Sequence, residues 1–207
     1  KRIRCSHFEP SAMERATRRM PAVIYLHGNS SSRLEALPVL SPLLQRGVTV
    51  FALDFAGSGL SDGEHVSLGY FEREDVEAAV EYLANSGTVS TIGLWGRSMG
   101  AVTALMCVAR GHHSISGIVC DSPFADLQVL SKEFAESYLQ IPVPKLMVSA
   151  ALEIIRSTIL QRANFDILDL APIKIVDACT VPVMFVAAHD DKFIDPHHTK
   201  QLYEISS

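Results

Sequence analysis

The sequence lacks a hydrophobic run long enough to cross a membrane. The longest apolar runs in its 207 residues lie at 99–109 and 181–188. A transmembrane helix needs about 20 apolar residues, so neither run qualifies. We therefore expect a protein that folds in water.

Closely spaced cysteines are also lacking. The four cysteines, at positions 5, 107, 120 and 179, form no C-x-x-C pair and no cluster with histidine at zinc spacing. Cys107 and Cys120 lie inside apolar runs, where a free cysteine behaves as a small buried hydrophobe. Free thiols are typical of a reducing compartment, and we accordingly expect a cytoplasmic protein.

The sequence has no excess of basic charge that would attract nucleic acid. Its 18 Lys and Arg residues face 23 Asp and Glu residues, which gives a formal net charge of −5. Basic residues gather near the start of the chain, as in the cluster Arg15–Arg19, which we interpret as a solvated loop. Because the remaining chain is acidic, we expect no nucleic-acid partner.

The sequence does contain enough apolar material for one folded domain. It is 48% hydrophobic and 20% charged, which is typical of a globular protein. We expect a single domain over residues 1–207. The chain begins with Lys1 rather than Met, and its strand-and-helix pattern stops at Ser207 without a closing element, so we expect this domain to be incomplete at its C-terminal end.

Short apolar runs rich in β-branched residues alternate with helical patterns along the chain. This alternation predicts an α/β fold with a mostly parallel sheet flanked by helices, its strands buried on both faces. The expected strands cover residues 3–8, 22–27, 48–54, 91–95, 115–121 and 181–188, and the expected helices include 33–45, 70–85, 98–110 and 196–205.

The helix expected at 70–85 opens with a cluster of acidic side chains. Glu72, Glu74, Asp75 and Glu77 favour the positive N-terminal end of a helix. We interpret the cluster as a solvent-facing helix surface rather than a metal site.

A long connection of 59 residues, 122–180, separates the last two expected strands. One crossover helix needs far fewer residues. Two helical patterns, 124–139 and 145–161, flank the helix breakers Pro142 and Pro144, and we predict a helical lid insertion over the strand ends. The alternative is contact between a membrane and the apolar face of the second helix, although few basic residues flank it. That face consists of Val148, Leu152, Ile155 and Ile159, widened by Met147, Ala151 and Ile154.

The most specific functional signal is Gly96-Arg97-Ser98-Met99-Gly100, which lies between an expected strand and an expected helix. In a G-x-S-x-G turn the serine occupies a sharp, strained corner, and small neighbours are needed because the two elements nearly collide. The following helix start stabilises negative charge nearby. Ser98 is therefore the predicted nucleophile. Arg97 is expected either to contact an acidic group of the substrate or to anchor the turn on a neighbouring loop.

A second loop, His27-Gly28-Asn29-Ser30, follows another expected strand. An acyl-transfer enzyme needs two backbone N–H donors aimed at the developing oxyanion, one after the nucleophile and one from a neighbouring loop. The Met99 N–H is the first candidate and the Asn29 N–H the second, with Ser30 as the alternative. We expect His27 to shape the loop by hydrogen bonding rather than to act as the catalytic base.

A third loop, residues 54–61, contains Gly57-Ser58-Gly59. A dinucleotide fingerprint requires a helix directly after the glycines and an acidic residue about 20 positions further on. The polar loop that follows does not meet this requirement. We therefore expect a tight turn and no bound cofactor.

Taken together, these loops resemble the α/β-hydrolase family. The resemblance spans essentially the whole chain and includes the segment Asp-Ser-Pro-Phe-Ala-Asp-Leu at 121–127. The chain most resembles an uncharacterised eukaryotic branch grouped with the serine aminopeptidase-like (S33-type) domains, which the segments 165–167 and 196–198 also resemble. This resemblance implies a hydrolase and does not establish peptidase activity.

The resemblance also implies a catalytic triad in the chain order Ser, Asp, His. The family places the acid in the loop after the strand expected at 181–188, which selects Asp191, with Asp190 as the fallback. Its carboxylate would orient the histidine and stabilise its charged form. The histidine is expected beyond residue 207, after one further strand. His197 and His198 stand at the start of a helix that leads away from the loop and are not the expected base.

Metal binding is the other interpretation of this segment. The spacing of its histidines and aspartates would allow them to share a metal ion. The segment contains no calcium-binding loop and no H-E-x-x-H motif, however, so we expect no metal. The residues concerned are His189, His197 and His198 with Asp190, Asp191 and Asp195.

The sequence therefore predicts a serine hydrolase that cleaves an ester or thioester bond in a small-molecule acyl substrate. Peptides are less favoured as substrates, because the expected lid is apolar and the sequence offers few charged residues to bind a charged substrate. Two alternatives remain open. One is a serine peptidase, and the other is a catalytically inactive binding or scaffold protein with the α/β-hydrolase fold, since the expected histidine is absent from residues 1–207.

Overall fold

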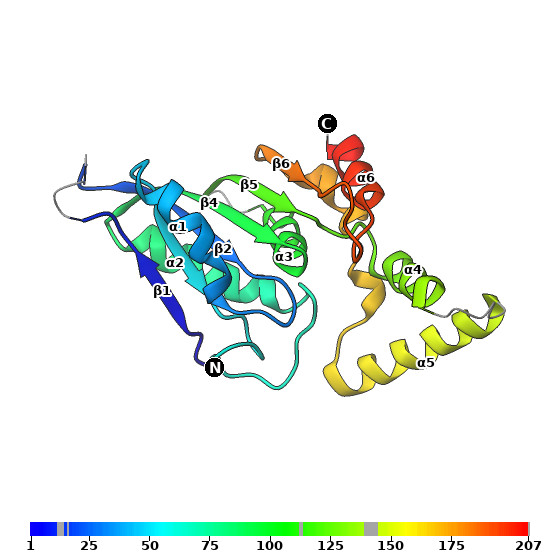
Figure 1. Cartoon of the computed structure of the whole chain (residues 1–207). Helices are drawn as coiled ribbons and strands as arrows, with labels where there is room; N and C mark the ends of the chain where they lie inside the picture. Colours follow the sequence, from blue (N-terminus) through cyan, green and yellow to red (C-terminus); the bar gives the residue numbers. More distant parts are fainter. Residues whose placement is uncertain (12–14, 16, 112–113, 139–144, 207) are drawn as a thin grey trace.

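The computed structural model describes residues 1–11, 15, 17–111, 114–138 and 145–206. Its centre is a six-stranded sheet with the order β1-β3-β2-β4-β5-β6 (Figure 1). β1 is antiparallel to β3, and all other neighbouring strands are parallel. The strands are β1 (Cys5–Phe8), β2 (Met20–Leu26), β3 (Thr49–Leu53), β4 (Val89–Arg97), β5 (Ile115–Asp121) and β6 (Val183–Val186).

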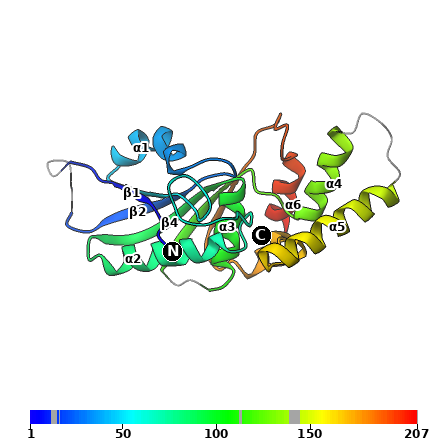
Figure 2. The ribbon, with the colours of Figure 1, turned by 90° about the horizontal axis from the view of Figure 1, so that it is seen from below.

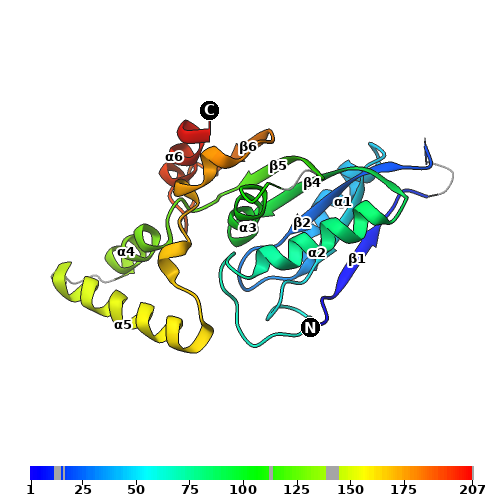
Figure 3. The ribbon, with the colours of Figure 1, turned by 180° about the vertical axis from the view of Figure 1, so that it is seen from behind.

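Helices cover both faces of the sheet, as the front and rear views show (Figure 1, Figure 3). α1 lies on one face, and α2 and α3 lie on the other. This arrangement confirms the predicted fold class. None of the helices in the described ranges combines the length and apolar character needed to span a bilayer. The helices are α1 (Leu37–Leu44), α2 (Glu72–Asn85), α3 (Met99–Val108), α4 (Leu127–Tyr138), α5 (Lys145–Ala163) and α6 (Pro196–Ser206).

The main hydrophobic core lies between the sheet and the helices α2 and α3. Every residue of β3 and of α3 is buried, and Leu202 of α6 joins the same cluster. Cys107 and Cys120 are fully buried, as predicted. Burial raises the pKa of the Cys107 thiol to about 12. Since the thiolate is the reactive form of cysteine, Cys107 acts here as a small hydrophobe.

The helix expected at 33–45 is divided into two pieces. A 3₁₀ turn covers Arg33–Ala36, and α1 covers Leu37–Leu44. α1 contains Pro42, which has no N–H to donate to the preceding turn. Pro42 therefore removes one hydrogen bond near the end of α1, whereas the division itself falls just ahead of Pro38, which stands in the first turn of α1.

β6 is shorter and more exposed than the sequence predicts. The expected strand covers 181–188 with both faces buried, whereas β6 covers Val183–Val186 and Met184 on it is 62% exposed. β6 stands at the end of the strand order and pairs with β5. One face packs on α6, where the rings of Phe185 and Tyr203 lie 6.4 Å apart. A strand at this edge is covered on one face only, which explains the difference.

Two acidic side chains at the start of α2 are buried, which corrects the expectation of a solvent-facing cluster. Glu72 is 1% exposed and accepts hydrogen bonds from the N–H and the hydroxyl of Ser67. Asp75 is also buried and accepts the Ala56 N–H at 2.9 Å. Carboxylates tolerate burial when their oxygens are hydrogen-bonded. Both side chains hold the loop before α2 in place.

The connection between β5 and β6 contains α4, α5 and three short 3₁₀ turns, within the region 122–180 where the sequence predicts a helical insertion. α5 lies beside α4 and extends away from the sheet (Figure 1, Figure 2). The segment 139–144, with Pro142 and Pro144, lies outside the described residues. The helices of the insertion are thus present, and its action as a lid stays a prediction.

The apolar face expected on α5 is only partly buried. Val148, Leu152 and Ile159 are half-buried, but Ile154 is 67% exposed, and Ile155 is exposed as well. The buried side of α5 packs on a small cluster with α4 rather than on the sheet.

Candidate active site

Ser98 lies at the corner between β4 and α3. Its backbone has φ 52° and ψ −116°, in a region that residues with a side chain rarely adopt. The Ser98 N–H donates to the Asp121 carbonyl at the end of β5, at 2.8 Å. This is the strained strand-turn-helix geometry that the G-x-S-x-G motif predicts.

Two glycines make this corner possible. A Cβ on Gly96 would overlap the carbonyl oxygen of Gly100, and a Cβ on Gly100 would overlap the carbonyl oxygen of Leu26 in β2. Both obstacles are backbone atoms, which cannot rotate out of the way. The near-collision that the motif predicts is therefore present.

The side chain of His27 holds the loop after β2. His27 is fully buried, its Nε2 accepts the Phe55 N–H at 3.1 Å, and its Nδ1 lies 2.7 Å from the Gly28 carbonyl oxygen. Since Phe55 donates to Nε2, the ring proton lies on Nδ1, which donates to Gly28. Both nitrogens are engaged, so His27 shapes the loop and offers no lone pair as a base.

The N–H groups of Asn29 and Met99 are open to a ligand. The Asn29 N–H makes no hydrogen bond to any described residue. The Ser30 N–H, by contrast, donates to the Asn29 side-chain oxygen at 2.9 Å. The Met99 N–H belongs to the first turn of α3, where N–H groups have no partner inside the helix. Of the two alternatives in this loop, the geometry favours Asn29 over Ser30.

A cavity of about 530 Å³ brings the predicted site residues together. Ser98, Met99, Asn29 and Asp191 all line it, and no histidine of the described chain does. Its size suits a small molecule. Most of the remaining lining is apolar and comes from α4 and from loops beside the sheet: Leu68, Phe124, Leu127, Leu130, Phe134, Phe193 and Ile194.

Asp191 has the geometry of an orienting carboxylate. Its Oδ1 accepts the N–H groups of Phe193 at 2.8 Å and Ile194 at 3.1 Å. Its Oδ2 accepts nothing from the described residues. Asp190 is exposed and does not line the cavity. A carboxylate fixed through one oxygen can present the other to a histidine, so the geometry favours Asp191 over the fallback.

Arg97 pairs with Glu35, a residue for which the sequence predicts no role. Arg97 donates to both carboxylate oxygens of Glu35, each at 2.9 Å. Burial raises the pKa of Glu35, but the hydrogen bonds from Arg97 and from the Gly28 N–H outweigh burial and lower it overall. Of the two predicted roles of Arg97, the structure shows the anchor on a neighbouring loop.

Ser122 is a second strained serine beside the cavity. It follows β5 as Ser98 follows β4, its φ is 50°, and it lines the same cavity. Burial raises the pKa of the preceding Asp121, and the charge of Asp191 adds to this effect. The sequence gives no local signal for this strain, because Ser122 has no glycine neighbours.

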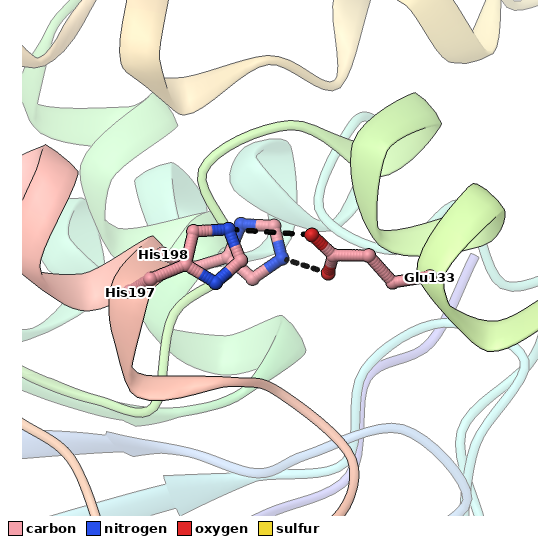
Figure 4. Close-up of side chains that lie close together, drawn as sticks. All are labelled: Glu133, His197 and His198. Carbon is pink, nitrogen blue, oxygen red and sulfur yellow. Dashed lines mark hydrogen bonds and ion pairs between the residues drawn. The ribbon is translucent and has the colours of Figure 1, made fainter. Parts of the chain in front are cut away.

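Glu133 of α4 faces two histidines at the start of α6 (Figure 4). His198 Nε2 lies 2.8 Å from one carboxylate oxygen, and His197 Nε2 lies 3.3 Å from the other. One ligand atom from each of the three residues falls within 4.8 Å of the others, close enough to share a metal ion. Two other residues whose spacing would allow a metal site, His189 and Asp190, are not part of this cluster.

The hydrogen bonds of His198 do not fit a metal ligand. Its Nδ1 accepts the Ala125 N–H at 3.3 Å, so Nε2 carries the proton and donates to Glu133. A metal would need an unprotonated Nε2. Burial also lowers the pKa of His198, which favours the neutral ring. The cluster is a hydrogen-bonded contact between α4 and α6.

The loop 54–61 is a tight turn around the buried carboxylate of Asp54. Asp54 pairs with Arg33 and accepts the Leu60 N–H at 2.9 Å. Gly59 has φ 56°, and a Cβ there would overlap the Asp54 carboxylate. Gly59 therefore accommodates a carboxylate of the protein itself, and a Cβ on Gly57 would overlap the His65 carbonyl oxygen.

The sheet order, the strained serine corner and the cavity at the strand ends together define the α/β-hydrolase fold. The profile of the family described as "Serine aminopeptidase, S33" matches residues 17–167, and the chain belongs to this family. The esterase Pf2001 of Pyrococcus furiosus has a similar fold, with a TM-score of 0.70 and 24% identity over 91% of this chain and 69% of that chain.

Sequence relatives occur in bacteria and in animals, so they do not single out the predicted eukaryotic branch. The uncharacterized protein YqkD of Bacillus subtilis is 31% identical over 192 residues, which cover 88% of this chain and 59% of that protein. The lysophosphatidylserine lipase ABHD12 of Danio rerio is 25% identical over 195 residues, which cover 90% of this chain and 47% of the lipase. The chain thus spans less than two thirds of either relative.

Proposed function

We propose that the protein is a serine hydrolase that cleaves the acyl bond of an ester or thioester. The observation that carries this proposal is the shared cavity, because Ser98, Asn29, Met99 and Asp191 all line it. The family and the esterase and lipase names of similar proteins support a hydrolase.

The proposed reaction begins when the Ser98 hydroxyl oxygen attacks the acyl carbonyl carbon and a histidine takes the hydroxyl proton. The carbonyl oxygen becomes negative and accepts hydrogen bonds from the N–H groups of Asn29 and Met99. The tetrahedral intermediate then expels the alcohol or thiol, which takes the proton from the histidine. A water molecule attacks the acyl-serine by the same route, which releases the acid and restores Ser98.

We assign the base to a histidine outside residues 1–207, oriented by Oδ2 of Asp191. Four histidines near the site support this assignment: His27, His197 and His198 are engaged elsewhere, and His189 is exposed and does not line the cavity. His27 and His198 are fully buried and use both ring nitrogens. His197 pairs with the carboxylates of Glu133 and Asp195.

The charges around the cavity favour a neutral acyl substrate. Arg97 and Asp191 are the charged residues on the described lining. Glu35 balances Arg97, which leaves no unpaired cation for an acidic group. If Asp191 orients the histidine, no carboxylate remains to bind the amino terminus of a peptide. Esters and thioesters are therefore favoured over peptides, in a protein that we place in the cytoplasm.

Hydrolysis of p-nitrophenyl esters by the full-length protein tests this function. Ser98→Ala should lower kcat by at least about 10³-fold, because the attacking oxygen is removed. Ser90→Ala, on the exposed side of β4, is the matched control and should keep wild-type activity. Equal kcat values for Ser98→Ala and the wild type would show that the nucleophile is assigned wrongly.

A catalytically inactive binding protein is the second candidate function. It is favoured by one observation, namely that no histidine of the described chain lines the cavity. This candidate predicts that the full-length wild type binds a neutral acyl ester in the cavity but hydrolyses none of the esters.

A further inference from the structure

The Glu35 carboxylate is the centre of a hydrogen-bond network that joins two loops of the candidate site. Arg97 donates to it from Nε and from Nη2, each at 2.9 Å. The Gly28 N–H and the Tyr25 hydroxyl each donate to its Oε1 at 3.2 Å. Arg97 directly precedes Ser98, and Gly28 directly precedes Asn29. Glu35 therefore connects the nucleophile turn with the loop that carries the second N–H donor.

Gly28 is held from both sides. Its N–H donates to Glu35, and its carbonyl oxygen accepts from Nδ1 of His27 at 2.7 Å. In a trans peptide the carbonyl and the following N–H point in opposite directions, so the His27 bond directs the Asn29 N–H away from His27. The Glu35 bond fixes the preceding peptide. Both bonds are needed to set the direction of the Asn29 N–H.

The Arg97 guanidinium also packs against this loop. A Cβ on Gly28 would lie 3.1 Å from Nη2 of Arg97, so the loop and the guanidinium are already in contact. The Glu35 side chain is 14% exposed and the Arg97 side chain 47%. A two-pronged pair on a partly buried carboxylate defines geometry better than an exposed, single contact does.

We propose that Glu35 and Arg97 form a positioning pair that keeps the Asn29 and Met99 N–H groups aimed at one point. The proposal rests on the serine hydrolase function, in which these N–H groups bind the oxyanion. Loss of one oxyanion donor costs about 10²–10³-fold in kcat. If the donor is displaced rather than removed, only part of this effect should appear, and kcat should fall by about 10–100-fold.

Two conservative variants of the full-length protein test the pair. Glu35→Gln removes the charge and one acceptor, and Arg97→Lys removes the planar fork. Both should lower kcat for p-nitrophenyl esters by about 10–100-fold and change KM by less than about threefold. The matched controls are Glu77→Gln and Arg110→Lys, which alter a different ion pair of 3.1 Å. A merely structural role would instead lower the thermal midpoint and leave kcat per folded molecule near the control value.

Hydrogen exchange read by mass spectrometry provides a measurement that needs no activity. Residues 26–31 should exchange faster in Glu35→Gln and Arg97→Lys than in the wild type, and at the wild-type rate in the controls. Exchange at the wild-type rate in these two variants, or a kcat within about twofold of that of an active wild type, would overturn the proposed positioning role. If the wild type hydrolyses no ester, the serine hydrolase function fails, and exchange alone decides whether Glu35 and Arg97 hold the loop.

Discussion

At the scale of single residues, Gly100 lets α3 begin in backbone contact with β2. A Cβ there would overlap the Leu26 carbonyl oxygen. We expect Gly100→Ala to lower the free energy of unfolding by about 1–3 kcal/mol, the usual effect of overpacking. Gly93→Ala in β4 is the control, since its Cβ would lie 3.5 Å from its nearest neighbour, the Gly117 carbonyl oxygen. Urea unfolding measures both variants, and a Gly100→Ala variant as stable as the wild type would refute the steric explanation.

Asp191 and Asp190 are neighbours in sequence with different expected effects on catalysis. Asp191→Asn keeps the shape of the side chain but removes the charge that stabilises a protonated histidine, and should lower kcat by about 10⁴-fold. Asp190→Asn should stay within a few-fold of the wild type, because Asp190 is exposed and does not line the cavity. Steady-state kinetics on esters compare the two, and a larger loss for Asp190→Asn would transfer the role to the fallback.

Local motifs predict Ser98, Met99 and Asn29 as neighbours of one cavity, because each follows a strand in a recognisable loop. Glu35 could not be predicted in this way. Its partner Arg97 is 62 residues away, and no pattern around Glu35 distinguishes it from any other surface glutamate. Long-range pairing of this kind is visible only after the strands are placed side by side.

At the scale of elements, α4 and α6 are joined by Glu133 and two histidines. Burial lowers the pKa of His198 below its ordinary value of 6.5, and His197 adds to this, while Glu133 and Asp195 raise it. Just below that value, the unfolded chain binds more protons than the folded one. The contribution of His198 to stability is therefore present above the ordinary pKa and is lost as the pH falls.

Because the pKa of His198 is lowered in the folded protein, the stability of the fold should depend on pH through the contact between α4 and α6. The wild type should lose stability between about pH 7 and about pH 5, and His198→Asn should lose less over the same interval. Exposed His65 offers the control His65→Asn, which should keep the wild-type pH dependence. Urea unfolding at a series of pH values gives the comparison, and identical slopes for His198→Asn and the wild type would contradict the prediction.

Most helices and strands follow from the local periodicity of apolar residues. The exceptions arise from prolines and from the position of a strand in the sheet. The expected strand at 115–121 matches β5, and the helix expected at 145–161 is close to α5. The helix expected at 33–45 divides between Ala36 and Leu37, just ahead of Pro38 in the first turn of α1. β6 differs because burial depends on where a strand lies in the sheet, and the apolar run 181–188 carries no information about that position.

At the scale of the whole molecule, the cavity forms where loops from several strands meet at their carboxyl ends. β2 leads to Asn29, β4 to Ser98, β5 to Ser122 and the segment after β6 to Asp191. Parallel strands place these ends at one edge of the sheet, where open α/β sheets bind ligands. α4 supplies much of the apolar wall, so the insertion shapes the cavity whether or not it moves as a lid.

Reaction of the full-length protein with a fluorophosphonate probe tests the nucleophile most directly. The probe forms a covalent bond only with an activated serine, and mass spectrometry of the digested protein locates the adduct. We predict one adduct, on Ser98, and none in Ser98→Ala. An adduct on another serine, labelling that persists in Ser98→Ala, or no adduct on the wild type would contradict a serine hydrolase built around Ser98.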